Sequence, residues 1–278
     1  MLLDQIETGS FGEANGIAQS LRVVSWNINR GLQFEAIVEF LAEQNADLIL
    51  LQECDVNAQR TGRRNVARDI AAMLGMNYAF AIEFQELTQS RNGSAAFHGQ
   101  ATLCRWPLLN ARPLRFRTQS GFWRPHWLIP NFGMFQRRVG GRVALVTCTR
   151  MGERTLVVYN LHLESRGNDP LRKAQVFELL ADIDQCSSDM PVVIAGDFNV
   201  DLKGQSVSSL LDSVSISNPF SHSIVKTIVS RSSARSGAID WILTKGPVSA
   251  RSPQVHSSVF ASDHFPLTLV LDVSGANL

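Results

Sequence analysis

The chain has 278 residues, of which 45% are hydrophobic and 18% are charged, and its formal net charge is +1. This length supports one large buried core. The balanced charge excludes a strongly polycationic protein and gives no overall attraction to nucleic acid. The N-terminus MLLDQIETGS lacks the apolar stretch of a secretory signal, and no run approaches the ~20 apolar residues of a transmembrane helix. We therefore expect a cytoplasmic protein with no transmembrane segment.

No linker rich in glycine, serine or proline divides the sequence. We expect a single domain over residues 21–278, preceded by an N-terminal arm at residues 1–20, which shows no periodicity. We expect the protein to be a monomer. The four cysteines form neither a CxxC pair nor a zinc-binding spacing, and three lie in or beside apolar runs. This placement favours buried, reduced thiols.

The first hundred residues alternate between continuous apolar runs and apolar residues at helical spacing. Continuous runs are typical of buried strands, whereas spacings of three and four residues indicate amphipathic helices. The pattern predicts strands at residues 21–28, 47–53, 77–84 and 95–104, and helices at residues 33–45 and 66–74, the second ended near Gly75.

Residues 105–139 interrupt this alternation with a stretch rich in arginine and tryptophan. Proline, glycine and asparagine break it repeatedly, so we predict a loop. Because arginine pairs with phosphates and aromatic rings stack on bases, we expect this loop to select the substrate, with Trp123 and Arg124 as contacts. An aromatic flap packed on the core is the alternative, and residues 127–130 are equally suited to a lipid surface.

The second half of the chain predicts a hairpin at residues 143–149 and 155–163. A long helix follows over Leu171–Ile183, with Asp169 as its N-cap. Strands are predicted at residues 192–195, 238–243, 255–260 and 267–271, with a short helix around 207–211 and a polar loop at 213–236. Hairpins mixed with helical crossovers indicate an α/β fold of two packed mixed sheets with outer helices.

Five short apolar runs end abruptly in acidic, amide or imidazole side chains. Because ligands bind at strand ends, five such endings in one chain predict one converging hydrolytic metal site. The runs and the polar residues after them are 21–26 with Asn27 and Asn29, 48–51 with Gln52 and Glu53, 156–161 with His162 and Glu164, 191–195 with Asp197 and Asn199, and 255–261 with Ser262, Asp263 and His264.

Two of these endings carry pairs suited to acid–base chemistry. In an extended chain Asp197 and Asn199 face the same way, so the carboxylate could take a proton from a water that the amide orients. An Asx turn capping the strand is the alternative. Asp263 could bind a divalent cation, and His264 could donate a proton or polarise a phosphoryl oxygen. A surface hydrogen bond is the alternative for that pair.

The remaining candidates stand in apolar surroundings. Glu53 closely follows four apolar residues, where either a cation or an ion pair with arginine would relieve the penalty of burying its charge. Asn27 and Asn29 share one face as neutral oxygen ligands or phosphate contacts, and His162 is either functional or a hydrogen-bonded core histidine. Asp240 is a lone acid that needs a partner such as histidine. This oxygen-rich set favours Mg2+ or Mn2+ over zinc.

The ordered motifs WNINRG, LLQE, YNLHLES, AGDFN, IDWIL and SDHFP resemble the signatures of the endonuclease/exonuclease/phosphatase superfamily. This superfamily includes DNase I, exonuclease III-type abasic endonucleases, sphingomyelinases, inositol polyphosphate 5-phosphatases, deadenylases and tyrosyl-DNA phosphodiesterase 2. The resemblance spans about residues 21–271. It implies a DNase I-like, four-layered α/β sandwich and Mg2+-dependent cleavage of a phosphate ester.

The resemblance also implies roles for individual residues. Asn27 and Glu53 would belong to the metal site with Asp263 nearby. Asp197 would act as the base toward the attacking water, and Asn199 would position that water or the phosphate. Asp240 would orient His264, which would stabilise the phosphorane-like transition state, and His162 would contact the phosphate or assist the leaving group. The run HLES followed by Arg166 is most similar to the tyrosyl-DNA phosphodiesterase 2 branch and its bacterial relatives. The expected substrate contacts are Asn29, Arg166, Trp123 and Arg124.

Three functions remain open at this point. The leading hypothesis is a hydrolase, a Mg2+- or Mn2+-dependent phosphodiesterase that acts on nucleic acid by in-line attack of an activated water. The second is an enzyme acting on small phosphoesters or phospholipid headgroups. The third is a non-catalytic binding module on the same fold, against which the complete set of candidate catalytic residues argues.

Overall fold

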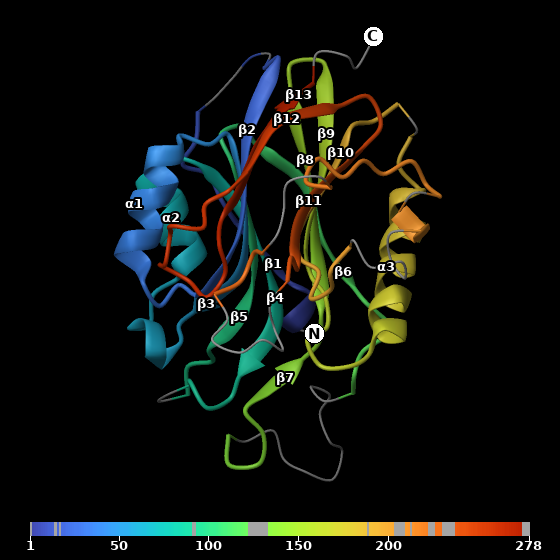
Figure 1. Ribbon diagram of the computed structural model, residues 1–278. Helices are drawn as coiled ribbons and strands as arrows, with labels where there is room; N and C mark the ends of the chain where they lie inside the picture. Colours follow the sequence, from blue (N-terminus) through green and yellow to red (C-terminus); the bar gives the residue numbers. More distant parts are fainter. Residues whose placement is uncertain are drawn as a thin grey trace.

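The computed structural model describes residues 2–13, 16, 18–90, 93–121, 133–187, 189–202, 209–211, 213–221, 226–229 and 237–273. Two β-sheets pack face to face, with helices on both outer surfaces (Figure 1). The predicted four-layered, DNase I-like α/β sandwich is therefore confirmed.

The first sheet has eight strands in the order β1-β4-β5-β3-β2-β13-β12, with β7 paired to β4. Its central strands β2 and β3 run parallel, and the other pairs are antiparallel. The strands are β1 (Ile6–Gly9), β2 (Ser20–Arg30), β3 (Leu48–Val56), β4 (Asn77–Glu86), β5 (Phe97–Cys104), β7 (Arg138–Gly140), β12 (Ser249–Val255) and β13 (Leu267–Asp272).

The second sheet has five strands in the order β11-β10-β9-β8-β6. Strands β9 and β10 are parallel, and the remaining pairs are antiparallel. The strands are β6 (Leu108–Arg115), β8 (Val143–Met151), β9 (Arg154–His162), β10 (Val192–Asp197) and β11 (Asp240–Lys245).

Alternation along β2 shows how the layers form. Leu21 and Val23 belong to the core shared with the second sheet, whereas Val24 and Trp26 face the helices α1 (Phe34–Gln44) and α2 (Val66–Leu74). Neighbouring side chains of a strand point to opposite faces, so one strand serves two cores. Helix α3 (Asp169–Ile183) covers the second sheet, and two short 3-10 helices lie at Leu2–Asp4 and Gln59–Thr61.

Both helices on the first sheet were predicted correctly, and α2 ends at the left-handed Gly75. Helix α3 was also predicted, but its N-cap is Asn168, whose side chain accepts a hydrogen bond from the Leu171 N–H. Asp169 is instead the first helical residue. Asn168 and Asp169 are adjacent and both side chains can accept the capping hydrogen bond, so the sequence alone did not distinguish them. Pro170, which follows them, suits the first turn of a helix.

Most of the other differences between the predicted and the observed elements concern strands at or near the sheet edges. The expected N-terminal arm contains β1, which pairs with β4 from Ile6 to Gly9. The stretch at 105–139 holds β6 and β7, so the prediction of a loop was wrong there. The strand predicted at 255–260 ends at Val255 and lies over 249–255 instead. Short or half-exposed strands lack the continuous apolar runs that identify buried ones.

The four cysteines are all free thiols, with Cys54 and Cys104 buried and the other two half-buried. Over the part of the chain that the structure describes, no helix is both long and apolar enough to cross a membrane.

Candidate active site

The candidate residues meet at one edge of the sandwich because of strand direction. Parallel β9 and β10 place His162 and Asp197 side by side at their ends. Strand β11 is antiparallel to β10, so its first residue, Asp240, pairs with Asp197. Strand β13 likewise begins where β2 ends, and just before it the Ser262 hydroxyl donates to the Asn27 carbonyl at 2.7 Å. Strand ends and strand beginnings therefore share this edge.

This arrangement corrects one sequence prediction. Residues 256–261 are not a strand, so Asp263 and His264 precede β13 instead of following a strand. Asp240 also begins a strand. An antiparallel strand brings its first residues to the edge at which its neighbour ends.

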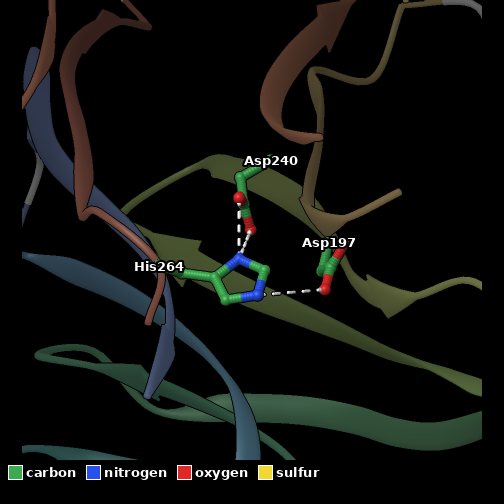
Figure 2. A group of neighbouring side chains, drawn as sticks. All are labelled: Asp197, Asp240 and His264. Carbon is green, nitrogen blue, oxygen red and sulfur yellow. Dashed lines mark hydrogen bonds and ion pairs between the residues drawn. The ribbon is translucent and has the colours of Figure 1, made fainter. Parts of the chain in front are cut away.

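His264 lies between two carboxylates, as Figure 2 shows. Both Asp240 oxygens accept from its Nδ1 at 2.9 and 3.0 Å, while its Nε2 lies 3.8 Å from Oδ2 of Asp197. Burial alone would lower the pKa of His264, but the charge and hydrogen bond of Asp240, with help from Asp197, raise it to about 10. His264 is therefore an imidazolium at neutral pH.

A second histidine, His162, lies near the same oxygen of Asp197. The Nε2 atom of His162 lies 3.4 Å from Oδ2 of Asp197, and its Nδ1 lies 3.6 Å from Oε2 of Glu83. Glu83 is fully buried on β4 and forms a 2.6 Å ion pair with Arg142. Burial would raise the pKa of Glu83, but Arg142 and His162 lower it to about 2. The Nδ1 atom of each histidine thus lies near a buried carboxylate, Glu83 for His162 and Asp240 for His264.

Sequence reasoning missed Glu83 and Arg142. Glu83 stands in the strand AFAIEFQE, where a single acid interrupts an apolar run. The same signal drew attention to Asp240, because a buried acid needs a partner. Applied to β4, it would have found Glu83 as well. No comparable signal marks Arg142.

Asn27 joins the two sheets at this edge. Its Nδ2 donates to Oδ2 of Asp197 at 3.2 Å, and its Oδ1 accepts from the backbone N–H of Asn29 at 3.1 Å. Because the Asn29 N–H is a donor, the amide orientation of Asn27 is determined. The Asn27 side chain thus contacts Asp197 through its Nδ2, and its Oδ1 already accepts one hydrogen bond, from the Asn29 N–H.

Asp197 and Asn199 form the Asx turn that was the alternative interpretation. The Asn199 N–H donates to Oδ1 of Asp197 at 2.8 Å, and its side-chain amide donates to the Leu163 carbonyl at 3.0 Å. Asn199 is left-handed, with φ 52°, so the chain is no longer extended there. The turn leaves Oδ2 as the Asp197 atom that faces the two histidines.

The ends of β2 and β3 are irregular where Asn29 and Glu53 lie. Three residue steps on β2, from Asn27 to Arg30, oppose two steps on β3, from Gln52 to Cys54. Asn29, Arg30 and Glu53 have positive φ values of 44°, 70° and 56°. Such bulges redirect side chains and are common beside active sites. The side chain of Asn29 is contacted by Arg30.

Glu53 fits a divalent cation better than the other acids of the site. Its side chain is 20% exposed and lies 3.8 Å from Arg30. Burial would raise the pKa of Glu53, but His98, His162 and Arg30 nearby lower it well below its usual range, so Glu53 is ionised. Asp263 lines the same cleft. Two carboxylates are the oxygen ligands that Mg2+ or Mn2+ requires.

Ligand atoms of Asp197, Asp240 and His264 also lie within 4.8 Å of one another, close enough to hold a metal ion. However, both Asp240 oxygens are bonded to the Nδ1 of His264. A metal there would have to break this hydrogen-bonded pair. The hydrogen bonds of the trio therefore suit acid–base chemistry better than metal binding.

A cleft of about 1210 Å³ opens over these residues. Six arginines and four carboxylates line it, among them the predicted contact Arg166. Four of the arginines form ion pairs with acids: Arg30 with Glu53, Arg60 with Asp55, Arg138 with Glu86 and Arg142 with Glu83. The predicted contacts Trp123 and Arg124 lie outside the described residues.

Residues 24–264 match the sequence profile of the Endonuclease/Exonuclease/phosphatase family. A search among curated proteins found no significant sequence match.

Solved structures with the same fold cover nearly the whole chain. The human Nocturnin catalytic domain with a bound sulfate anion superposes with a TM-score of 0.67 at 18% identity, covering 96% of this chain and 97% of that one. ANGEL2, a 2′,3′-cyclic phosphatase, gives 0.66 at 18% identity, covering 92% and 95%. A humanised D. rerio TDP2 gives 0.61 at 18% identity, covering 91% and 99%. At these identities the likeness establishes the fold.

Proposed function

Because the chain belongs to the Endonuclease/Exonuclease/phosphatase family, we propose that it is a divalent-metal-dependent phosphodiesterase acting on nucleic acid. Members of this family are hydrolases of phosphoester bonds. The observation that carries the proposal is the position of Asp197, whose Oδ2 lies between two imidazoles, each backed by a buried carboxylate.

The proposed reaction is attack of water on phosphorus with loss of the ester oxygen. Asp197 accepts the proton of the attacking water, and Asn27 and the Asn199 N–H hold its carboxylate in place. His264, kept cationic by Asp240, donates a hydrogen bond to a phosphoryl oxygen as negative charge develops there. His162, whose Nε2 lies 3.4 Å from Oδ2 of Asp197, would contact the phosphate or stabilise the leaving oxygen.

When bound, a divalent cation would supply positive charge beside the phosphate. We propose Mg2+ or Mn2+, held by Glu53 and Asp263, because both offer only oxygen. We also keep cytoplasmic location and a monomeric state as proposals. The free thiols are compatible with a reducing compartment.

Nucleic acid is the preferred substrate class because of the size and charge of the cleft. Its volume of about 1210 Å³ exceeds what one phosphate group needs, and six arginines line it. Arginine binds phosphate through paired N–H groups. A chain of several phosphates would contact more of these arginines than a small phosphoester would.

Phosphoesters with an apolar part are the second candidate. Leu32 and Phe135 line the cleft and are 49% and 55% exposed, and the adjacent Met134 is 89% exposed. Exposed apolar groups beside a phosphate site suit lipid headgroups at a membrane surface.

A substrate panel tests the proposal. Labelled single-stranded, duplex, abasic, 5′-blocked and 2′,3′-cyclic-phosphate oligonucleotides are incubated beside small phosphoesters and phospholipid vesicles, with Mg2+ or Mn2+. We expect oligonucleotide cleavage that a chelator and Asp197→Ala both abolish. Glu153→Gln, which changes an exposed acid of the β8–β9 turn, is the matched control. Turnover of lipids or small phosphoesters with every oligonucleotide intact would favour the second candidate.

A further inference from the structure

Glu53 reaches the cleft from a distortion that involves three adjacent strands. Beyond its irregular pairing with β2, strand β3 has three residue steps, from Leu51 to Cys54, opposite two steps of β5, from Ala101 to Gly99. A bulge interrupts the hydrogen bonds between strands and needs other contacts to fix its shape. The direction of the Glu53 side chain depends on that shape.

One side chain of the opposite sheet contacts this distortion. Asn160 of β9 is fully buried, and its Nδ2 donates to the carbonyls of Ala101 at 2.8 Å and Leu51 at 3.1 Å. Leu51 and Ala101 are the last regular pair before the bulge. Oδ1 of Asn160 accepts from Gln52, the neighbour of Glu53, at 2.8 Å. Both polar atoms of the amide are therefore bonded to the strands that form the bulge.

Asn160 also has a fixed relation to the catalytic histidine. It lies two residues before His162 on β9, so both side chains point to the same face of the second sheet. The bonds of Asn160 thereby set the separation between Glu53 on the first sheet and the His162–Asp197 pair on the second. A buried, fully bonded amide resists displacement because each lost bond leaves a polar group without water.

We propose that Asn160 is a positioning residue that holds the β3 bulge so that Glu53 points at the cation. This inference rests on the proposed function only in assigning the cation to Glu53. Residues that orient a metal ligand without touching the metal change metal affinity by about 10- to 100-fold when they are replaced. The bonding pattern of Asn160 gives it that role.

The test measures Mg2+ binding directly by calorimetry, so it does not depend on knowing the substrate. Asn160→Leu keeps the volume of the side chain and removes all three bonds. We expect Mg2+ affinity to fall by about 10- to 100-fold. Gln52→Met removes only the bond from Gln52 to Oδ1 of Asn160, so we expect a smaller loss of Mg2+ affinity. This variant also tests the proposal if Asn160→Leu does not fold. Loss of Mg2+ binding in the Glu53→Gln variant would show that Glu53 holds the cation.

Gln100→Met is the matched control. Gln100 is equally buried and its side chain also joins the two sheets, by donating to the Val143 carbonyl at 2.8 Å. It lies in the β5 segment opposite the bulge, but among the described residues its side chain makes no hydrogen bond to β3. We expect Asn160→Leu and Gln100→Met to lower the melting temperature without metal to a similar extent. Only the Asn160 and Gln52 variants should weaken Mg2+ binding, a distinction that a merely structural role would not produce.

The outcomes separate this inference from the proposed function. Wild-type affinity in folded Asn160→Leu or Gln52→Met would overturn the role of Asn160. Unchanged Mg2+ binding by Glu53→Gln would overturn both the inference and the metal assignment. Mg2+ binding that is weakened as expected, in a protein that cleaves no oligonucleotide, would support the inference and count against nucleic acid as substrate.

Discussion

The two histidines that flank Asp197 differ in how their carboxylates are neutralised. Asp240 bonds His264 through both oxygens at 2.9 and 3.0 Å, and among the described residues no arginine ion pair to Asp240 occurs. Glu83 lies farther from His162, at 3.6 Å, and forms a 2.6 Å pair with Arg142. The charge of Asp240 therefore acts almost entirely on its histidine, whereas that of Glu83 is divided.

This difference shows that similar residue types can do different work at one site. His264 is held cationic, with a pKa of about 10, which suits charge stabilisation on phosphate. Glu83 is tied into a buried ion pair, which suits the fixing of a position. We expect changes on the Asp240 side to act mainly on catalysis and changes on the Glu83 side to act mainly on stability.

Among the variants of these two histidine–carboxylate pairs, Asp240→Asn should lower activity the most. The neutral amide no longer stabilises the imidazolium, so the pKa of His264 falls from about 10 toward its ordinary 6.5. We expect kcat to fall by about 10³-fold, at the upper end of the range for loss of a preorganised charge-stabilising donor. Protonated His264 is the active form, so the loss of activity at alkaline pH should move to lower pH. A pH–rate profile of both proteins measures this; an unmoved alkaline limb would contradict it.

Arg142→Met should instead affect stability. It leaves Glu83 and Glu164, both fully buried, without the guanidinium that lies 2.6 and 3.8 Å from them. We expect the free energy of unfolding to fall by about 3 kcal/mol, as when a buried pair loses one partner. Denaturant titration measures the change. The double variant Arg142→Met with Glu83→Gln should recover part of the loss, and full additivity would disprove the coupling.

The acid stability of the protein should depend on Glu83. Its pKa is lowered from 4.5 unfolded to about 2 folded, so its contribution to stability is complete above pH 4.5 and is lost as the pH falls toward 2. The contribution is about 3 kcal/mol. Glu83→Gln should flatten the fall of unfolding free energy over this range. Denaturant titrations at pH 5, 4 and 3 give the slope, and equal slopes would refute the assignment.

The smallest effect should be that of Glu83→Gln on catalysis at neutral pH. An amide can still contact Nδ1 of His162, so the histidine keeps its place and loses only part of its electrostatic support. We expect kcat to fall by about tenfold, equivalent to about 1.4 kcal/mol. Steady-state kinetics beside Asp240→Asn give the comparison. A loss from Glu83→Gln as large as that from Asp240→Asn would show that the two sides are equivalent.

Elements with a strong periodic signal were predictable. The helices α1 and α2 and the buried strands β3, β8 and β10 combine clear apolar patterns with tertiary burial, so local and global preferences agree. Strands β6 and β12 were missed because they are half-exposed and carry arginine and proline, which edge strands tolerate.

The site was predictable where chemistry follows a buried strand directly. Glu53, His162 and Asp197 stand in such places, and the structure brings them to one cleft. Glu83, Arg142 and Asn160 are interior residues whose roles arise from partners on the other sheet. A single sequence can mark Glu83 as an acid in an apolar run, but it cannot identify partners more than fifty residues away.

The sequence by itself determined the kinds of residue available and the buried strands that carry them, because periodicity and burial are properties of short segments. Only the tertiary structure decided which ends of the strands meet. Asp240 and His264 reach the site because β11 and β13 run antiparallel to their neighbours, and Glu53 reaches it through a left-handed bulge. Strand direction and register depend on pairings across the whole chain, which no short segment specifies.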